Sequence, residues 1–168
     1  MPVLPWISAV VLLLGVVAVA AEPPAVTWTS YRDPEHGYSV ELPLGLFEAV
    51  EAEGSPGITL AEVGGEARLS FYGGPAEGMT RDGLEARLAA GEDVAVVTYR
   101  DGGDSWFVLS GYYQPDGEGS STIFYTKVLF SADHGSFSAF EISFPEADKP
   151  RFEAVVERLE DNFTRPTR

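Results

Sequence analysis

From residue 25 onward, apolar and polar side chains alternate with a period of two. In the stretch GYSVELP, Tyr38, Val40 and Leu42 share one side of an extended chain, whereas Ser39 and Glu41 share the other. Comparable apolar-rich runs at 58–63, 67–73, 94–100, 105–113, 121–131 and 136–144 are bounded by turn residues. This period predicts a sheet built largely from hairpins.

Two segments depart from this period and have the spacing of amphipathic helices. The first is expected over residues 80–90, with Thr80 as its N-cap, Leu84 and Leu88 one turn apart, and Gly91 as its stop. The second follows Asp148, and its apolar stripe comprises Phe152, Val155, Val156, Leu159 and Phe163. We therefore expect the α+β class, with an antiparallel β-sheet flanked by helices.

The chain has two histidines, His36 and His134, and both stand in turn sequences. A loop over residues 133–135, with Gly135 in the left-handed conformation, would join the strands at 121–131 and 136–144. That loop would place Lys127 opposite Glu141 as an opposite-charge pair across the hairpin. We interpret both histidines as turn residues.

Reactive sites could also be assembled from these residues. His36 and His134, together with Glu35 and Asp133, are of the types that bind Zn²⁺. Ser110, His134 and an acidic residue would have the composition of a catalytic triad, but no G-x-S-x-G motif occurs. Because two hairpin tips need not lie near each other, the sequence predicts no catalytic residue, no metal site and no cofactor.

Charge and cysteine content exclude several classes of protein. The formal net charge is −15, which disfavours nucleic acid and anionic membranes as partners because like charges repel. The chain contains no cysteine, and this excludes disulfides, thiolate metal sites and a cysteine nucleophile.

Residues 1–21 resemble a secretory signal peptide. An apolar run over residues 7–20 ends in the small-x-small pattern Ala18-Val19-Ala20, and Pro23 and Pro24 follow. We expect residues 22–168 to be a single domain in the periplasm or outside the cell, without stable membrane insertion after cleavage. The alternative is an uncleaved anchor, since the run approaches the ~20 residues needed to span a bilayer.

The order of elements and several short motifs resemble a known superfamily. The motifs are Y.D...GYSVELP, W.VLSGY, YTKVLFS...FEISFP and a terminal helix ending in NF.RP. Together they are similar to small exported bacterial proteins of the PsbP-like α/β/α sandwich superfamily, over roughly residues 27–166. The resemblance implies an antiparallel sheet flanked by helices, and a binding or assembly module without cofactor chemistry.

Aromatic side chains with polar groups are the candidates for binding. Trp106, Tyr112, Tyr113 and Tyr125 stand on predicted strands, where such residues often line ligand or partner surfaces. We expect an exported, non-enzymatic binding or assembly module for an envelope protein or a small apolar ligand. The alternative is an envelope hydrolase or metal-dependent enzyme whose site the sequence does not reveal.

Overall fold

The computed structural model describes residues 26–51, 57–115 and 119–168. The predicted signal peptide, residues 1–21, lies outside the described residues, as does most of the segment that connects it to the sheet. No helix in these described ranges combines the length and apolar character needed to cross a membrane.

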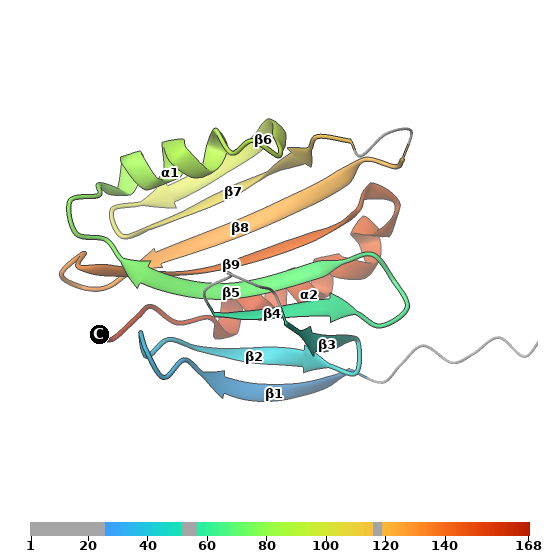
Figure 1. Cartoon of the computed structure of the whole chain (residues 1–168), viewed down its shortest axis with the longest axis horizontal. Coiled ribbons are helices and arrows are strands. Elements are labelled where there is room, and N and C mark those ends of the chain that lie inside the picture. Colours follow the sequence, from blue (N-terminus) through green and yellow to red (C-terminus); the bar gives the residue numbers. More distant parts are fainter. Residues whose placement is uncertain (1–25, 52–56, 116–118) are drawn as a thin grey trace, which may run out of the picture.

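A nine-stranded, mostly antiparallel sheet dominates the fold (Figure 1). Its strands are β1 (Thr27–Arg32), β2 (Ser39–Leu44), β3 (Phe47–Val50), β4 (Ile58–Glu62), β5 (Arg68–Pro75), β6 (Val94–Gly103), β7 (Trp106–Tyr113), β8 (Thr122–Phe130) and β9 (Ser136–Pro145). Their spatial order is β1-β2-β3-β4-β5-β9-β8-β7-β6. The short contact between β2 and β3, at Leu44 and Phe47, is the parallel step in an otherwise antiparallel ladder.

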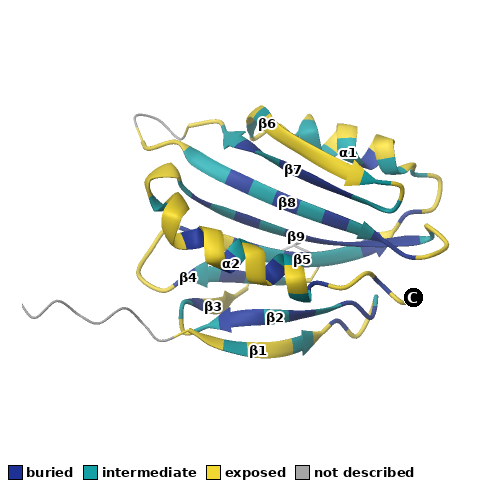
Figure 2. Cartoon of the chain, turned by 180° about the vertical axis from the view of Figure 1, so that it is seen from behind, coloured by how far each residue is buried: buried dark blue, intermediate teal, exposed yellow. Residues whose placement is uncertain are grey.

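The helices lie on opposite faces of this sheet (Figures 1 and 2). Helix α1 (Arg81–Ala89) begins after Thr80, whose hydroxyl accepts a hydrogen bond from the Gly83 amide at 3.0 Å, as the sequence predicts. Helix α2 (Lys149–Asn162) follows a single 3₁₀ turn, η1 (Glu146–Asp148). Each helix covers only part of its face, so the sheet is flanked by helices without being enclosed by them.

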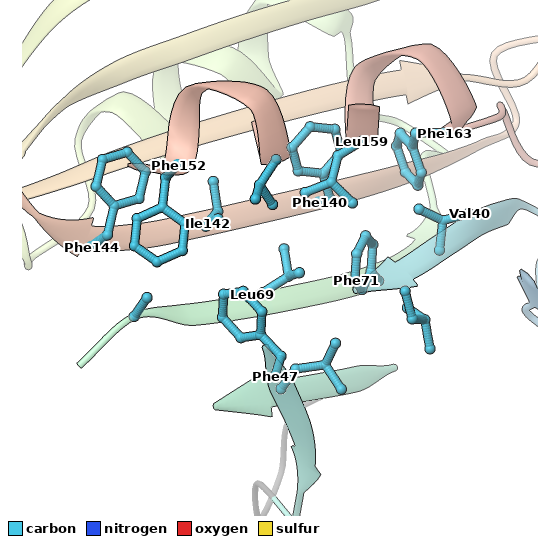
Figure 3. Packing of buried hydrophobic residues seen from close by; sticks show 14 of the residues in the cluster. Val40, Phe47, Leu69, Phe71, Phe140, Ile142, Phe144, Phe152, Leu159 and Phe163 are labelled. Atoms are coloured by element: carbon cyan, nitrogen blue, oxygen red, sulfur yellow. The ribbon is translucent and has the colours of Figure 1, made fainter. Parts of the chain in front are cut away.

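One core lies between α2 and the sheet, and the predicted apolar stripe of α2 forms its helical side (Figure 3). Phe152 and Leu159 are fully buried, while Val155 and Phe163 are nearly so. Val156 is partly buried at the edge of the same cluster. The alternating residues Tyr38, Val40 and Leu42 of the predicted strand GYSVELP face this core, which confirms the half-buried strand predicted there.

A second core lies on the other face, beneath α1. Leu84 of α1 packs against buried residues of β7, β8 and β9. The sheet residues of this cluster are Phe107, Leu109, Phe124, Val128, Phe130, Phe137 and Ala139. Because both sheet faces bury apolar side chains, the central strands are apolar on both sides.

The predicted register of the β8–β9 hairpin is wrong by one residue. Lys127 pairs with Phe140, and Glu141 pairs with Thr126. The loop has four residues, 132–135, because the Ser131 amide donates to the Ser136 carbonyl at 3.0 Å. The left-handed residue is His134, with φ of 59°, in place of Gly135. This shift turns Lys127 toward α2, where it forms an ion pair with Glu160 at 3.1 Å.

Strand β7 lies second from the edge of the sheet, although its two apolar faces favour a central position. On the α1 side, Phe107 and Leu109 are buried in the second core. On the other side, Trp106 and Tyr112 are only half-buried. Figure 2 shows why, since α2 lies over β9, β5 and β2 and leaves β6, β7 and much of β8 uncovered.

Candidate functional site

The four predicted binding aromatics do not form one cluster. Successive side chains of a strand point to opposite faces of the sheet, so Tyr112 and Tyr113 diverge. Tyr112 and Trp106 lie on the α2 side of β7, and Tyr125 of β8 lies on the same side. Tyr113 lies on the α1 side, where its ring stacks on Phe124 with centroids 4.9 Å apart.

Tyr99 of β6 stands in the same row of the sheet as Tyr125, with Ser110 of β7 between them. In the register of the sheet, Tyr99 pairs with Ser110, and Ser110 pairs with Tyr125. Side chains at paired positions of neighbouring strands point to the same face of a sheet, so Tyr99, Ser110 and Tyr125 share the α2 side. Val96 stands opposite Tyr112 in the neighbouring row.

We call this surface the aromatic face, and it comprises Val96, Tyr99, Trp106, Tyr112 and Tyr125. Val96 is 48% exposed and Tyr99 is 52% exposed, the two highest values among the exposed large apolar side chains of the described residues, and both stand on one face of β6. Trp106 belongs to the same face but stands six residues from Tyr112 along β7. The aromatic face is therefore an elongated surface and not a compact cavity.

Each tyrosine of the aromatic face donates a hydrogen bond to a carboxylate. Tyr125 donates to Glu160 of α2 at 2.6 Å, and Tyr112 donates to Glu146 at 2.7 Å. Tyr99 makes a longer contact of 3.4 Å with Asp101 on its own strand. These bonds orient the rings and give the aromatic face a rim of three negative charges.

The same environment raises the pKa of these phenols. Burial raises the pKa of Tyr125, and the Glu160 carboxylate adds to the effect by accepting its hydrogen bond. The negative charge of Asp101 raises the pKa of the exposed Tyr99. All three hydroxyls therefore remain protonated donors at neutral pH.

Several residues of this surface were not predicted as site residues from the sequence. Val96 and the carboxylates of Asp101, Glu146 and Glu160 fall in this group. Glu160 follows Val156 by four residues and so stands beside the apolar stripe of α2. That position was a usable signal, but the tyrosine it meets could be found only from the packing of the helix on the sheet.

Tyr113 lies outside the aromatic face and lines a hollow on the opposite face of the sheet. Its hydroxyl donates a short hydrogen bond to Glu141, which also accepts from Thr126 at 3.0 Å. The hollow has a volume of about 720 Å³ and is lined by Glu66, Asp93, Tyr113, Gln114, Gly119, Ser120, Thr122 and Glu141. Such a polar and acidic lining does not suit an apolar ligand.

Both histidines have structural partners. The Asp33 carboxylate accepts hydrogen bonds from the amides of Glu35 and His36, and lies 3.2 Å from the His36 ring. The His134 ring stacks on Phe130 with centroids 5.6 Å apart. Within residues 26–51, 57–115 and 119–168, no three His, Asp or Glu side chains are grouped as a metal site would require.

Sequence comparison finds no relative of this chain, since no protein-family model and no curated protein matches it. Comparison of structures does find similar proteins. The solution structure of cyanobacterial PsbP (CyanoP) from Synechocystis sp. PCC 6803 superimposes with a TM-score of 0.57 at 15% identity. The superposition covers 90% of this chain and 98% of CyanoP. The chain has a PsbP-like fold.

Two further solved structures share this PsbP-like fold. The Ran-binding protein Mog1p of Saccharomyces cerevisiae has a TM-score of 0.57 at 5% identity, over 83% of this chain and 96% of Mog1p. LpqN of Mycobacterium tuberculosis, described as involved in cell envelope biogenesis, has a TM-score of 0.50 at 12% identity. Its superposition covers 84% of this chain and 91% of LpqN. At these identities the likeness establishes the fold alone.

Proposed function

We propose that this chain is an exported, non-enzymatic module that docks a protein partner on the aromatic face. The observation that carries the proposal is the exposure of Val96 and Tyr99 beside Tyr112 and Tyr125, on a part of the sheet that α2 leaves uncovered. Tyrosine and tryptophan supply much of the binding energy at protein interfaces, because each combines a large apolar area with a hydrogen-bonding group.

A protein partner fits this surface better than a small apolar ligand does. Apolar ligands bind in concave sites that bury most of their surface, whereas the aromatic face extends along β6, β7 and β8. The hollow beside Tyr113 is concave, but three carboxylates line it. An interface with tyrosines at its centre and charges at its rim matches the anatomy of a protein contact.

The solved structures with this fold support the proposal by analogy. Mog1p is a Ran-binding protein, so the PsbP-like fold can serve as a protein-binding module. LpqN is involved in cell envelope biogenesis, and the signal-like residues 1–21 support a comparable compartment for this chain. The likeness to Mog1p supports a protein-binding role for this fold, and the likeness to LpqN supports an envelope location.

Site-specific crosslinking in the source organism tests the proposal. A photoreactive phenylalanine analogue at position 99 is expected to capture a discrete envelope protein. The same residue at position 153, an exposed site on α2, serves as the matched control and should not capture that protein.

The captured protein is then purified and titrated against the wild type and a Val96→Ser/Tyr99→Ser variant. Loss of two central contacts should weaken binding about fivefold or more. Equal capture from positions 99 and 153, or equal affinity of the two proteins, would show that the aromatic face is not the docking site.

A further inference from the structure

The aromatic face borders an edge strand, β6. Within the described part of the chain, β6 pairs on one side only, with β7. It is 10 residues long, and seven of these are exposed. An edge strand presents a row of backbone N–H and C=O groups that can pair with another chain.

Part of this edge is regular enough to pair. The ladder between β6 and β7 shifts register between Val94 and Val96 and again between Val97 and Tyr99, and such bulges discourage pairing. From Tyr99 to Gly103 the ladder is continuous. These residues contain no proline, and the first of them, Tyr99, belongs to the aromatic face.

At the opposite edge of the sheet, the aromatic side chain already has a cation. The side chain of Trp28 in β1 is covered by Arg158 of α2, whose guanidinium lies 4.5 Å from the ring centroid. Arg158 is held there by Glu41 at 2.8 Å. This contact also shows that the protein combines guanidinium, aromatic ring and carboxylate within its own structure.

Like the site at Trp28, the aromatic face contains aromatic rings and carboxylates, but it has no arginine over its rings among the described residues. Three carboxylates, from Asp101, Glu146 and Glu160, surround the tyrosines. Lys127 is a cation of this surface, and it is already paired with Glu160. Arg100, on the other side of β6, is paired with Glu85 of α1. A partner that supplies guanidinium groups would complete the arrangement seen at Trp28.

We infer that the outer edge of β6 receives an extended, basic segment of the protein partner by strand addition, with arginine side chains at alternate positions over the aromatic face. The alternation follows because every second side chain of the added strand points to this face. The inference rests on the proposed function and specifies its partner. A second copy of this chain is the less favourable occupant, since each copy carries a net charge of −15.

Binding of designed peptides to the folded protein tests the inference. The probe is a nine-residue peptide of alternating arginine and threonine with blocked ends, and the control has glutamate in place of arginine. We expect saturable binding of the basic peptide that weakens with added salt, and none of the acidic one. Equal binding of the acidic peptide would overturn the inference.

Two N-methylated forms of the basic peptide separate strand addition from simple charge attraction. One form is methylated on the odd-numbered amides and the other on the even-numbered amides, with all side chains unchanged. Because alternate amides of a strand point away from its neighbour, one form should bind and the other should not. Amides of β6 that face away from β7 should also become protected from hydrogen exchange.

The possible results distinguish this inference from the proposed function. If both methylated forms bind equally and no β6 amide is protected, strand addition is wrong, while docking on the aromatic face still stands on its crosslinking result. Asp101→Asn and Tyr99→Ser should each weaken binding of the basic peptide about two- to fivefold. If neither variant changes the affinity, or if the basic peptide does not bind, the inference is overturned.

Discussion

At the tip of the β8–β9 hairpin, His134 adopts a left-handed backbone conformation with φ of 59°. The loop tolerates it because Asp133 accepts hydrogen bonds from the Ser131 hydroxyl at 2.7 Å and the Gly135 amide at 3.1 Å. The hydrogen bond from Ser131 also lowers the pKa of Asp133. The geometry of the turn therefore comes from a side chain, and glycine is not needed at its left-handed position.

Substitution at position 134 should follow this backbone preference. Asparagine tolerates positive φ, so His134→Asn should change the free energy of unfolding little. His134→Val should cost about 1–2 kcal/mol, because a β-branched residue resists that conformation. Gly135→Ala is the control and should be nearly neutral, since its new Cβ would meet the Asp133 carboxylate at 3.4 Å, an ordinary contact. Urea unfolding measures all three, and a larger loss in Gly135→Ala would contradict the assignment.

The phenol of Tyr125 should make stability depend on alkaline pH. Its pKa in the folded protein is raised above the ordinary value of 10.0. A group with a raised folded pKa contributes stability that is fully present below its unfolded pKa. That contribution is lost as the pH rises above about 10 toward the folded pKa.

Thermal unfolding between pH 8 and pH 11 checks this expectation. Tyr125→Phe removes the titrating group together with its hydrogen bond to Glu160. The variant should be less stable than the wild type at pH 8, and the difference should shrink toward pH 11. Parallel pH profiles of the two proteins would show that the hydroxyl is not coupled to folding.

At the scale of elements, α2 secures the larger of the two cores. Leu159 is fully buried against the sheet, and its truncation should leave a cavity. We expect Leu159→Ala to lower the free energy of unfolding by about 2–5 kcal/mol. Glu153→Ala, on the exposed side of the same helix, should be within about 0.5 kcal/mol of the wild type. Near-equal stability of the two variants would mean that the helix does not contribute to the core.

The described part of the molecule is one sheet with a helix on each face, and the signal-like residues 1–21 precede it. The apolar run and the small-x-small pattern predict that the exported form begins at Ala21 or Glu22. Mass spectrometry of the protein recovered from the compartment outside the cytoplasm checks this prediction. Recovery of a chain that begins at Met1 or Pro2 would favour the anchored alternative.

The sequence alone determined most of the strands, because a two-residue alternation such as that of Tyr38, Val40 and Leu42 is a local property of the chain. The edge strand β1 and the short strand β3 were not among the predicted strands. The sequence likewise determined α2, whose stripe from Phe152 to Phe163 recurs with the helical period. Both patterns are set by residues a few positions apart, so no knowledge of distant contacts was needed. The likeness to PsbP-like proteins followed from the same order of elements, and the superposition on CyanoP confirms the fold.

Only the tertiary structure decided the hairpin register and the aromatic face. The register depended on the hydrogen bonds that Asp133 accepts within the loop. They stabilise a loop of four residues, one more than the predicted glycine turn, and this difference shifts the strand pairing by one residue. The aromatic face depended on where α2 lies, since a helix that covered β6 and β7 would have buried Tyr99 and Tyr112. The position of a helix on a sheet is fixed by packing among residues far apart in the chain, and local periodicity does not determine that packing.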